Sequence, residues 1–221
     1  LSLHDALPIS LVGDGTEEVI VEGIALNNPE DMLNPAGGWQ IVVQGEGADE
    51  AGTFAWAAGF YGYGNQGVPT WEEERDRLNA SGFRAGDRVR VTGFAMAVGG
   101  KANINERHSP APAMDFEVEI ITEDVGLPAP ELTTLGEMNT FDDTRETGGE
   151  RYQGRLIRIN DVRIKSSTWA ANARDLVLED AAGNELPLWL GTSPLFNTMP
   201  APTGWIDVIG IGNQEPQFGD S

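Results

Sequence analysis

The stretch Pro69–Gly93 constrains the fold most, because the signals that start and stop a helix occur there immediately before a strand. Thr70 and Glu73 have the spacing of a capping box, in which the hydroxyl accepts from the Glu73 amide and the carboxylate reaches back. Gly82 suits the position just after the last turn, where a left-handed backbone ends a helix. We therefore predict a helix over about Trp71–Ser81.

A strand follows this helix after a short connection. Over Gly86–Gly93, Val89 and Val91 alternate with charged or polar residues, which is the period-two pattern of a strand buried on one face. A helix between the third and fourth strands of a small barrel is the arrangement of an OB-fold, so we predict an OB-like five-stranded barrel here. The strands predicted for this barrel are Glu17–Leu26, Trp39–Gln44, Thr53–Ala58, Arg88–Ala97 and Phe116–Ile121.

The second half of the sequence carries a similar series of strand signals. Tyr152–Ile164 is predicted to be a long strand, and its apolar positions change parity, which indicates a bulge near Asn160-Asp161. Leu176–Leu178 and Leu186–Leu190 are predicted to form a hairpin, and Trp205–Gly212 a fourth strand. Since no fifth strand follows, we predict a second OB-like barrel that is truncated before its last strand and has an open edge.

The predicted fold class is therefore all-β, with two consecutive OB-like barrels joined by a linker. Gly126–Pro130 favours an extended connection, and a helical turn is expected within Leu132–Phe141. Leu1–Ile9 matches the translation of a common sequencing adapter, so we interpret it as an artefact; a genuine disordered N-terminus is the alternative. The predicted organisation is 1–10 as the artefact, 11–125 as the first barrel, 126–150 as the linker and 151–221 as the incomplete second barrel.

The chain is strongly acidic and contains no cysteine. With 14 Lys and Arg against 35 Asp and Glu, its formal net charge of -21 repels phosphate backbones and disfavours nucleic-acid binding by charge neutralisation. The absence of cysteine excludes disulfides, thiolate zinc sites and cysteine nucleophiles. No apolar run approaches the ~20 residues of a membrane span, so membrane insertion is not expected.

Three segments carry a resemblance to a known type of domain: Gly86–Gly93, Tyr152–Leu156 and Trp205–Gln214. They resemble tandem OB-like domains of secreted or surface multidomain bacterial proteins of the planctomycete type, which also occur beside secreted nucleases and phosphoesterases. The resemblance extends from Glu17 to the end of the sequence. It implies a pair of barrels and an extracellular or cell-surface location, and it assigns no site residue.

The sequence contains no convincing catalytic motif, and we predict that the chain is not an enzyme. His108 lies in a polar stretch without a nucleophile elbow, so we interpret it as a solvated loop residue. Gly62–Gly67 lacks the Lys-Ser/Thr of a phosphate-binding loop and is interpreted as a barrel loop. Three oxygen-rich segments could hold a structural calcium ion or form ordinary turns, so no metal site is assigned and no cofactor is predicted. These segments are Asn27–Asp31, Asp142–Glu150 and Glu179–Glu185.

Aromatic residues are the candidates for ligand binding. OB-folds bind oligonucleotides and oligosaccharides on the face of strands two and three and in the flanking loops, and aromatic rings stack on bases or sugars. The alternative interpretation places Trp56 in the core and lets the loop aromatics cover the barrel ends. The candidate residues are Trp56, Phe60, Tyr61, Tyr63 and Trp169.

The predicted function is a non-catalytic extracellular binding or spacer module of a larger bacterial protein, with neighbouring domains and a protein or glycan as partners. The alternative is a nucleic-acid-binding accessory part of a secreted nuclease or phosphoesterase. That alternative requires a continuous basic stripe and an affinity that falls steeply with salt. The residues that would form the stripe are Arg84, Arg88, Arg90, Lys101 and Arg107.

Overall fold

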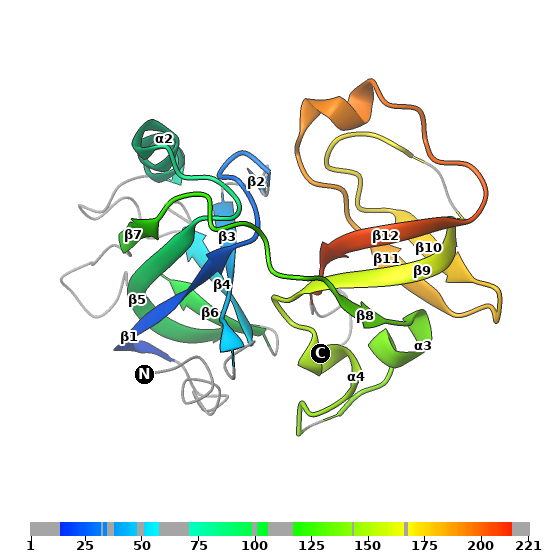
Figure 1. The fold of residues 1–221 in the computed structure, drawn as a ribbon, viewed down its shortest axis with the longest axis horizontal. Helices are drawn as coiled ribbons and strands as arrows, with labels where there is room; N and C mark the ends of the chain where they lie inside the picture. Colours follow the sequence, from blue (N-terminus) through cyan, green and yellow to red (C-terminus); the bar gives the residue numbers. More distant parts are fainter. Residues whose placement is uncertain are drawn as a thin grey trace. The chain divides into compact units, whose positions relative to one another are not determined.

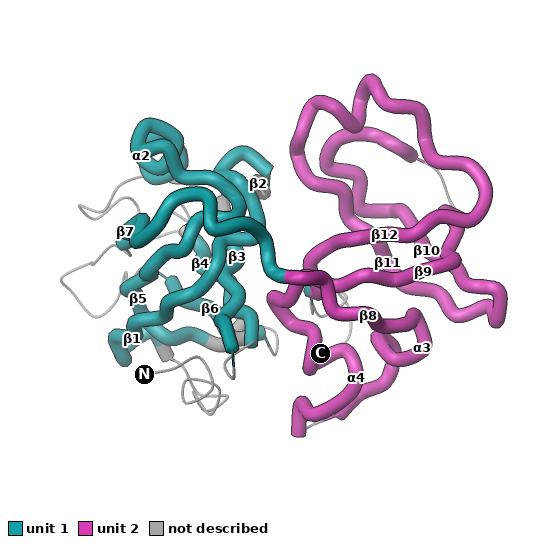
Figure 2. Tube along the Cα trace, viewed as in Figure 1, with its two compact units in different colours: residues 1–128, 213–221 teal, residues 129–212 magenta. Residues whose placement is uncertain are grey.

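The chain divides into two units in its computed structural model (Figure 2). The first unit comprises residues 1–128 with 213–221, and the second comprises residues 129–212. None of the helices in the part of the chain that the structure describes is long and apolar enough to cross a membrane. The described residues are 14–31, 33–34, 38–47, 51–57, 71–98, 101–105, 117–142, 144–165 and 168–213.

The first unit is built mainly from strands (Figure 1). Its elements are β1 (Asp14–Ala25), β2 (Leu33–Asn34), β3 (Gly38–Gln44), β4 (Gly52–Ala57), α2 (Trp71–Ser81), β5 (Arg88–Val98), β6 (Lys101–Asn105) and β7 (Glu117–Thr122). Five of the strands close into a barrel in the order β1-β3-β4-β6-β5, and β5 pairs back with β1. Neighbouring barrel strands are antiparallel, except β4 and β6, which run parallel.

Alternating apolar residues of the strands fill the barrel. Ile41 and Val43 of β3 and Val89 and Val91 of β5 are fully buried in one cluster. Arg90, between the two valines, points the other way and is half-buried, as the period-two pattern predicts. The predicted β-strand character of this segment is therefore confirmed.

Helix α2 has the bounds that the sequence predicts, and Gly82 ends it. The backbone of Gly82 is left-handed, with a φ of +86°. Its N–H donates to the Asn79 carbonyl and the Phe83 N–H donates to the Leu78 carbonyl, the paired bonds of a Schellman motif. Leu78 and Phe83 are buried in the barrel cluster, so this end of the helix is fixed by packing. Thr70, the predicted capping residue, lies outside the described residues.

The strand that closes the barrel is not the predicted one. The sequence predicts Phe116–Ile121 as the fifth strand, whereas β6 lies between β4 and β5 and completes the barrel. The long strand β5 pairs with β7 through residues 88–92 and with β6 through residues 94–98. Strands β7 and β6 therefore follow one another along the same edge of β5. Strand β6 escapes sequence reading because Ile104 is its only large apolar residue.

The second unit is an open sheet (Figure 1). Its elements are β8 (Glu131–Thr133), α3 (Leu135–Met138), α4 (Gly148–Arg151), β9 (Leu156–Ile164), β10 (Leu176–Asp180), β11 (Glu185–Leu188), the 3-10 helix η2 (Pro194–Asn197) and β12 (Ile206–Ile211). The strand order is β11-β10-β9-β12, and β8 pairs with β9 in parallel. The described residues form the predicted hairpin and an open edge but no second closed barrel.

The bulge predicted in β9 is confirmed. Strand β12 pairs Val208 with Ile159 but Ile206 with Val162, so β9 carries an additional residue between these pairs. Asp161 has a φ of 53°, and Ile159 and Val162 both lie in the core despite their unequal parity. The bulge thus keeps one apolar face along the whole strand.

The sequence predicts a linker over 126–150, whereas the structure places much of it in the second unit. Strand β8 pairs with β9, and Leu135 of α3 is 1% exposed within the sheet's core. The helical turn predicted in Leu132–Phe141 is present as α3. These elements are too short to show a period in the sequence, and long-range pairing and burial define them.

Glu131 of β8 holds two arginines of the second unit. It accepts hydrogen bonds from Arg151 Nη2 at 2.7 Å and from Arg155 Nη1 at 2.8 Å. Burial alone would raise the pKa of Glu131, but the hydrogen bonds and charges of both guanidinium groups outweigh it and lower the pKa below its ordinary 4.5. The stabilisation of the second unit by these ion pairs is therefore fully present above pH 4.5, and it is lost as the pH falls through the lowered pKa of Glu131.

We expect Glu131→Gln to destabilise the second unit by about 1 kcal/mol at neutral pH, since bonds to charged groups contribute roughly 1.5–3 kcal/mol and partial exposure reduces this. The difference from the unmodified chain should vanish in acid. Urea titrations at a series of pH values measure both effects. The control is Glu146→Gln, because Glu146 is exposed and the hydrogen bonds described for it use its backbone N–H and carbonyl, which the substitution keeps. Stability curves of Glu131→Gln and the unmodified chain that stay parallel into acid would contradict this account.

Candidate functional site

The best candidate for a binding site lies on the side of the barrel strands that faces away from the core. Ile41, Ala55 and Ile104 point into the barrel cluster, so their neighbours along each strand point outward. We call this face of β3, β4, β5 and β6 the outer wall. Its side chains are Gln40, Val42, Phe54, Trp56, Phe94, Met96, Lys101, Asn103 and Asn105.

Trp56 lies between two amide side chains on the outer wall. Strand pairing places it opposite Gln40 of β3 on one side and opposite Asn105 of β6 on the other. Neighbouring strands of a sheet lie about 4.7–4.9 Å apart, so the indole and both amides belong to one patch. Trp56 and Asn105 are half-buried, and Gln40 is 9% exposed. We call these three residues the Trp56 patch.

Both amides of the Trp56 patch carry an acceptor that is not used. Gln40 Oε1 and Asn105 Oδ1 are buried and have no hydrogen-bond partner. The Asn105 amide nitrogen lies 3.1 Å from Met96 Sδ, a weak acceptor. Unpaired buried acceptors are costly, and a ligand would reach these two oxygens only if the amide side chains turned outward. As it stands, the patch offers the half-buried face of Trp56 for stacking.

Most of the outer wall beyond the Trp56 patch is buried, and its lysine, Lys101, already contacts other groups of the chain. Val42, Phe54 and Phe94 are no more than 2% exposed. Lys101 Nζ lies 4.4 Å from the centroid of the Phe54 ring and donates to Asn213 Oδ1 at 3.3 Å. Lys101, predicted as part of a basic stripe, is therefore held against an aromatic ring and is only 6% exposed.

None of the other predicted aromatic residues is seen in the Trp56 patch among the described residues. Phe60, Tyr61 and Tyr63 lie outside the described residues. Trp169 belongs to the second unit, where its ring packs edge-on against Phe196 with centroids 5.6 Å apart. It also contacts a buried cluster that includes Leu176, so it serves packing.

The described arginines of the predicted stripe interact with the chain's own groups. Arg88 pairs with Glu46 at 2.8 Å, and Arg90 pairs with both Glu22 at 2.7 Å and Glu119 at 2.6 Å. The hydrogen bond and charge of Glu46 raise the pKa of Arg88, and Glu22 does the same for Arg90.

Arg84, the third of these arginines, donates to the Phe83 carbonyl at 2.6 Å. Arg107 lies outside the described residues. A phosphate would have to compete with carboxylates for Arg88 and Arg90, which weakens the nucleic-acid alternative.

In each of the three oxygen-rich segments, an aspartate accepts hydrogen bonds from residues of its own turn. Asp31 accepts from the Asn28 N–H at 3.0 Å and from Asn28 Nδ2 at 2.8 Å. Asp142 accepts from the amide and hydroxyl groups of both Thr144 and Thr147, and these bonds hold the pKa of its carboxyl far below the usual range. Asp180 accepts from Asn184 and Ala182, which lowers its pKa as well. Among the residues that the structure describes, no group of three or more Asp, Glu, His or Cys is arranged to hold a metal ion.

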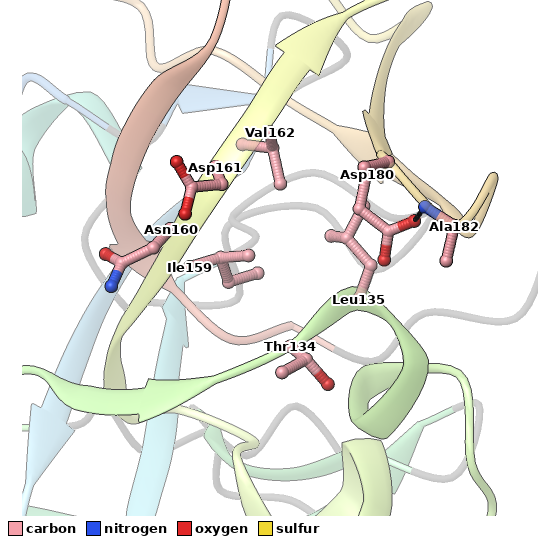
Figure 3. Close-up of a pocket in the computed structure, with 9 residues that line it drawn as sticks. Thr134, Leu135, Ile159, Asn160, Asp161, Val162, Asp180 and Ala182 are labelled. Carbon is pink, nitrogen blue, oxygen red and sulfur yellow. Dashed lines mark hydrogen bonds between the residues drawn. The ribbon is translucent and has the colours of Figure 1, made fainter.

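A shallow pocket of about 240 Å³ lies beside the bulge of β9 (Figure 3). Thr134, Leu135 and Val162 line it, together with Asp161 and Asp180. The Asp180 carboxylate is directed to the Ala182 amide at 2.9 Å, as the dashed line in Figure 3 shows. The Asp180 carboxylate of this pocket is therefore used within its own turn.

His108, the predicted loop histidine, lies outside the described residues.

The chain was compared with protein families and with curated proteins. No family model and no curated protein matches it.

Proposed function

We propose that this chain is a non-catalytic binding and spacer module of a larger bacterial secreted or surface protein. We further propose that both units are OB-like. The closed barrel with α2 between its third and fourth strands supports this for the first unit. The second unit has the same antiparallel arrangement in its first four barrel-type strands, β9, β10, β11 and β12.

The observation that carries a binding role is the Trp56 patch. It lies on the face of the second and third barrel strands, which is where OB-folds bind their ligands. A half-buried indole ring suits the apolar face of a sugar, and the two buried amide oxygens would accept from its hydroxyl groups once their side chains turn outward. The net charge of -21 favours a neutral ligand over an anionic one. We therefore propose a neutral glycan as the ligand.

Titration with a panel of neutral hexose oligosaccharides by calorimetry tests this proposal. We expect Trp56→Ala to weaken binding about tenfold or more, because stacking on an aromatic ring contributes roughly 1–3 kcal/mol. Trp205→Ala is the matched control, since Trp205 is 51% exposed in the second unit and should leave the affinity unchanged.

Two results would contradict the proposal. One is that no oligosaccharide binds the unmodified chain. The other is salt-sensitive binding of single-stranded DNA that is lost when Arg88 and Arg90 are replaced, which would favour the nucleic-acid alternative.

A further inference from the structure

An exposed tryptophan lies on the outward face of the second unit's sheet. Trp189 directly follows β11 and is 40% exposed. Its neighbours Leu188 and Leu190 pack into one core cluster with Leu176, so Trp189 between them points away from that cluster. The indole therefore leaves a large apolar surface in contact with water.

Trp189 lies opposite two residues of the neighbouring strand, because the pairing carries a bulge there. The first residue of β10 pairs with the last residue of β11, and beyond that pair the Leu190 N–H donates to the Ala173 carbonyl at 2.9 Å. Between these two points one strand has Arg174 and Asp175, whereas the other has Trp189 alone. Both residues opposite the indole are exposed, so a cation and a carboxylate flank it at the surface.

The Arg174 guanidinium is held against the Trp189 ring. Its Cζ lies 4.6 Å from the ring centroid, which is a cation–π contact. Trp205, another exposed tryptophan of this unit, has Arg163 at 5.4 Å, but Arg163 Nε donates to Glu179 at 2.8 Å. Arg174 forms no ion pair in the part of the chain that the structure describes. Its donors are therefore positioned by the ring and remain for a ligand.

Trp189 has the same place in its unit as Trp56 has in the barrel. Strand β11 pairs antiparallel with β10, as β4 does with β3. Trp56 is the last residue but one of β4, and Trp189 comes directly after β11. Each follows an inward residue, Ala55 or Leu188, and so points outward. Both units thus present a tryptophan on the outward face where the third barrel-type strand ends.

We propose that Trp189, Arg174 and Asp175 form a second binding site for a neutral glycan, separate from the Trp56 patch. This inference takes its ligand class from the proposed function. The exposed part of the indole would stack on the apolar face of a sugar. Arg174 would donate to the sugar's oxygens, and the Asp175 carboxylate would accept from its hydroxyl groups. The charges of Arg174 and Asp175 cancel locally, which suits an uncharged ligand.

Nuclear magnetic resonance of the tryptophan indole N–H groups tests the inference on the full chain. The six tryptophans give separate signals, which single Trp→Phe variants assign. The probes are linear trimers of glucose, galactose and mannose. With the trimer that binds, we expect the Trp189 and Trp56 signals each to shift and saturate, and the Trp205 signal to stay in place.

Replacing Arg174 tests the site without touching a tryptophan. Arg174→Gln should weaken the binding measured at the Trp189 signal about tenfold, because hydrogen bonds from a charged group are lost. The variant should fold normally, since Arg174 is exposed. Arg163→Gln is the matched control: it removes the guanidinium over Trp205 and should leave the titration curves of Trp189 and Trp56 unchanged.

The inference is overturned if the Trp56 signal moves and the Trp189 signal does not, or if Arg174→Gln leaves the Trp189 curve unchanged. Either result leaves the Trp56 patch standing. The reverse result, saturation at Trp189 without a shift at Trp56, supports the inference and contradicts the role of the Trp56 patch. A Trp189 signal that moves with protein concentration in the absence of sugar would assign this face to self-association and would also overturn the inference.

Discussion

Replacing Gly23 by alanine is expected to destabilise the barrel by about 3 kcal/mol or more, because the added carbon has no space. A Cβ at Gly23 would lie 2.3 Å from the Gln44 carbonyl oxygen and 2.7 Å from its carbon. The obstacle is backbone, which cannot rotate away as a side chain can. Strand β1 pairs with β3 on one side and β5 on the other, so relieving the clash would break one of these pairings.

Urea denaturation followed by tryptophan fluorescence measures this loss. Gly210→Ala is the matched control: it is the same substitution in a strand, but a Cβ at Gly210 meets nothing within 4 Å. We expect that control to change stability by less than about 0.5 kcal/mol. Equal losses in the two variants would show that the backbone approach at Gly23 is unimportant.

Removing the Asn27 side chain is expected to cost the barrel about 2–4 kcal/mol, because it leaves buried backbone groups without partners. Asn27 is 5% exposed just after β1. Its Nδ2 donates to the Gln40 carbonyl at 3.1 Å, and its Oδ1 accepts from the Val42 N–H at 2.8 Å. In Asn27→Ala, the Val42 N–H would be buried and unpaired.

Asn27→Asp separates the two bonds, since it keeps the acceptor for Val42 and loses the donor to Gln40. At neutral pH its ionised carboxylate would be buried against the Gln40 carbonyl, so its stability in urea should fall to that of Asn27→Ala or below. Protonation in acid restores a donor and should recover part of the loss. A loss in Asn27→Ala below about 0.5 kcal/mol would contradict the account. Because Gln40 belongs to the Trp56 patch, Asn27→Ala should also loosen the strand that presents it.

Much of the first unit could be predicted from the sequence because its signals are local. The cap glycine and the alternation around Val89 identify α2 and β5 without any knowledge of the fold. Strand β6 could not be predicted, because Lys101 and Asn103 are polar yet buried. A sequence reading treats such residues as solvent-facing, whereas on the outer wall they are covered.

The candidate site was predictable only in part, because strand pairing and not local sequence brings its residues together. Trp56 is conspicuous because its large aromatic side chain lies in a predicted strand and can stack on a ligand. Gln40 and Asn105 have no signal of their own, and only the pairing of β3, β4 and β6 places them beside it. Trp169 has the same residue type as Trp56 but packs against Phe196, and its side-chain type alone could not distinguish the two roles.

The way β5 is shared has a mechanical consequence for the first unit. Strand β1 begins opposite Met96 at one end of β5, and β7 ends opposite Arg88 at the other end. Tension between the start of β1 and the end of β7 therefore pulls the two strands along β5 in opposite directions. The antiparallel hydrogen bonds lie across that pull, so they bear the load together and do not open one after another. A barrel loaded in shear in this way resists extension, which is what a spacer under strain requires.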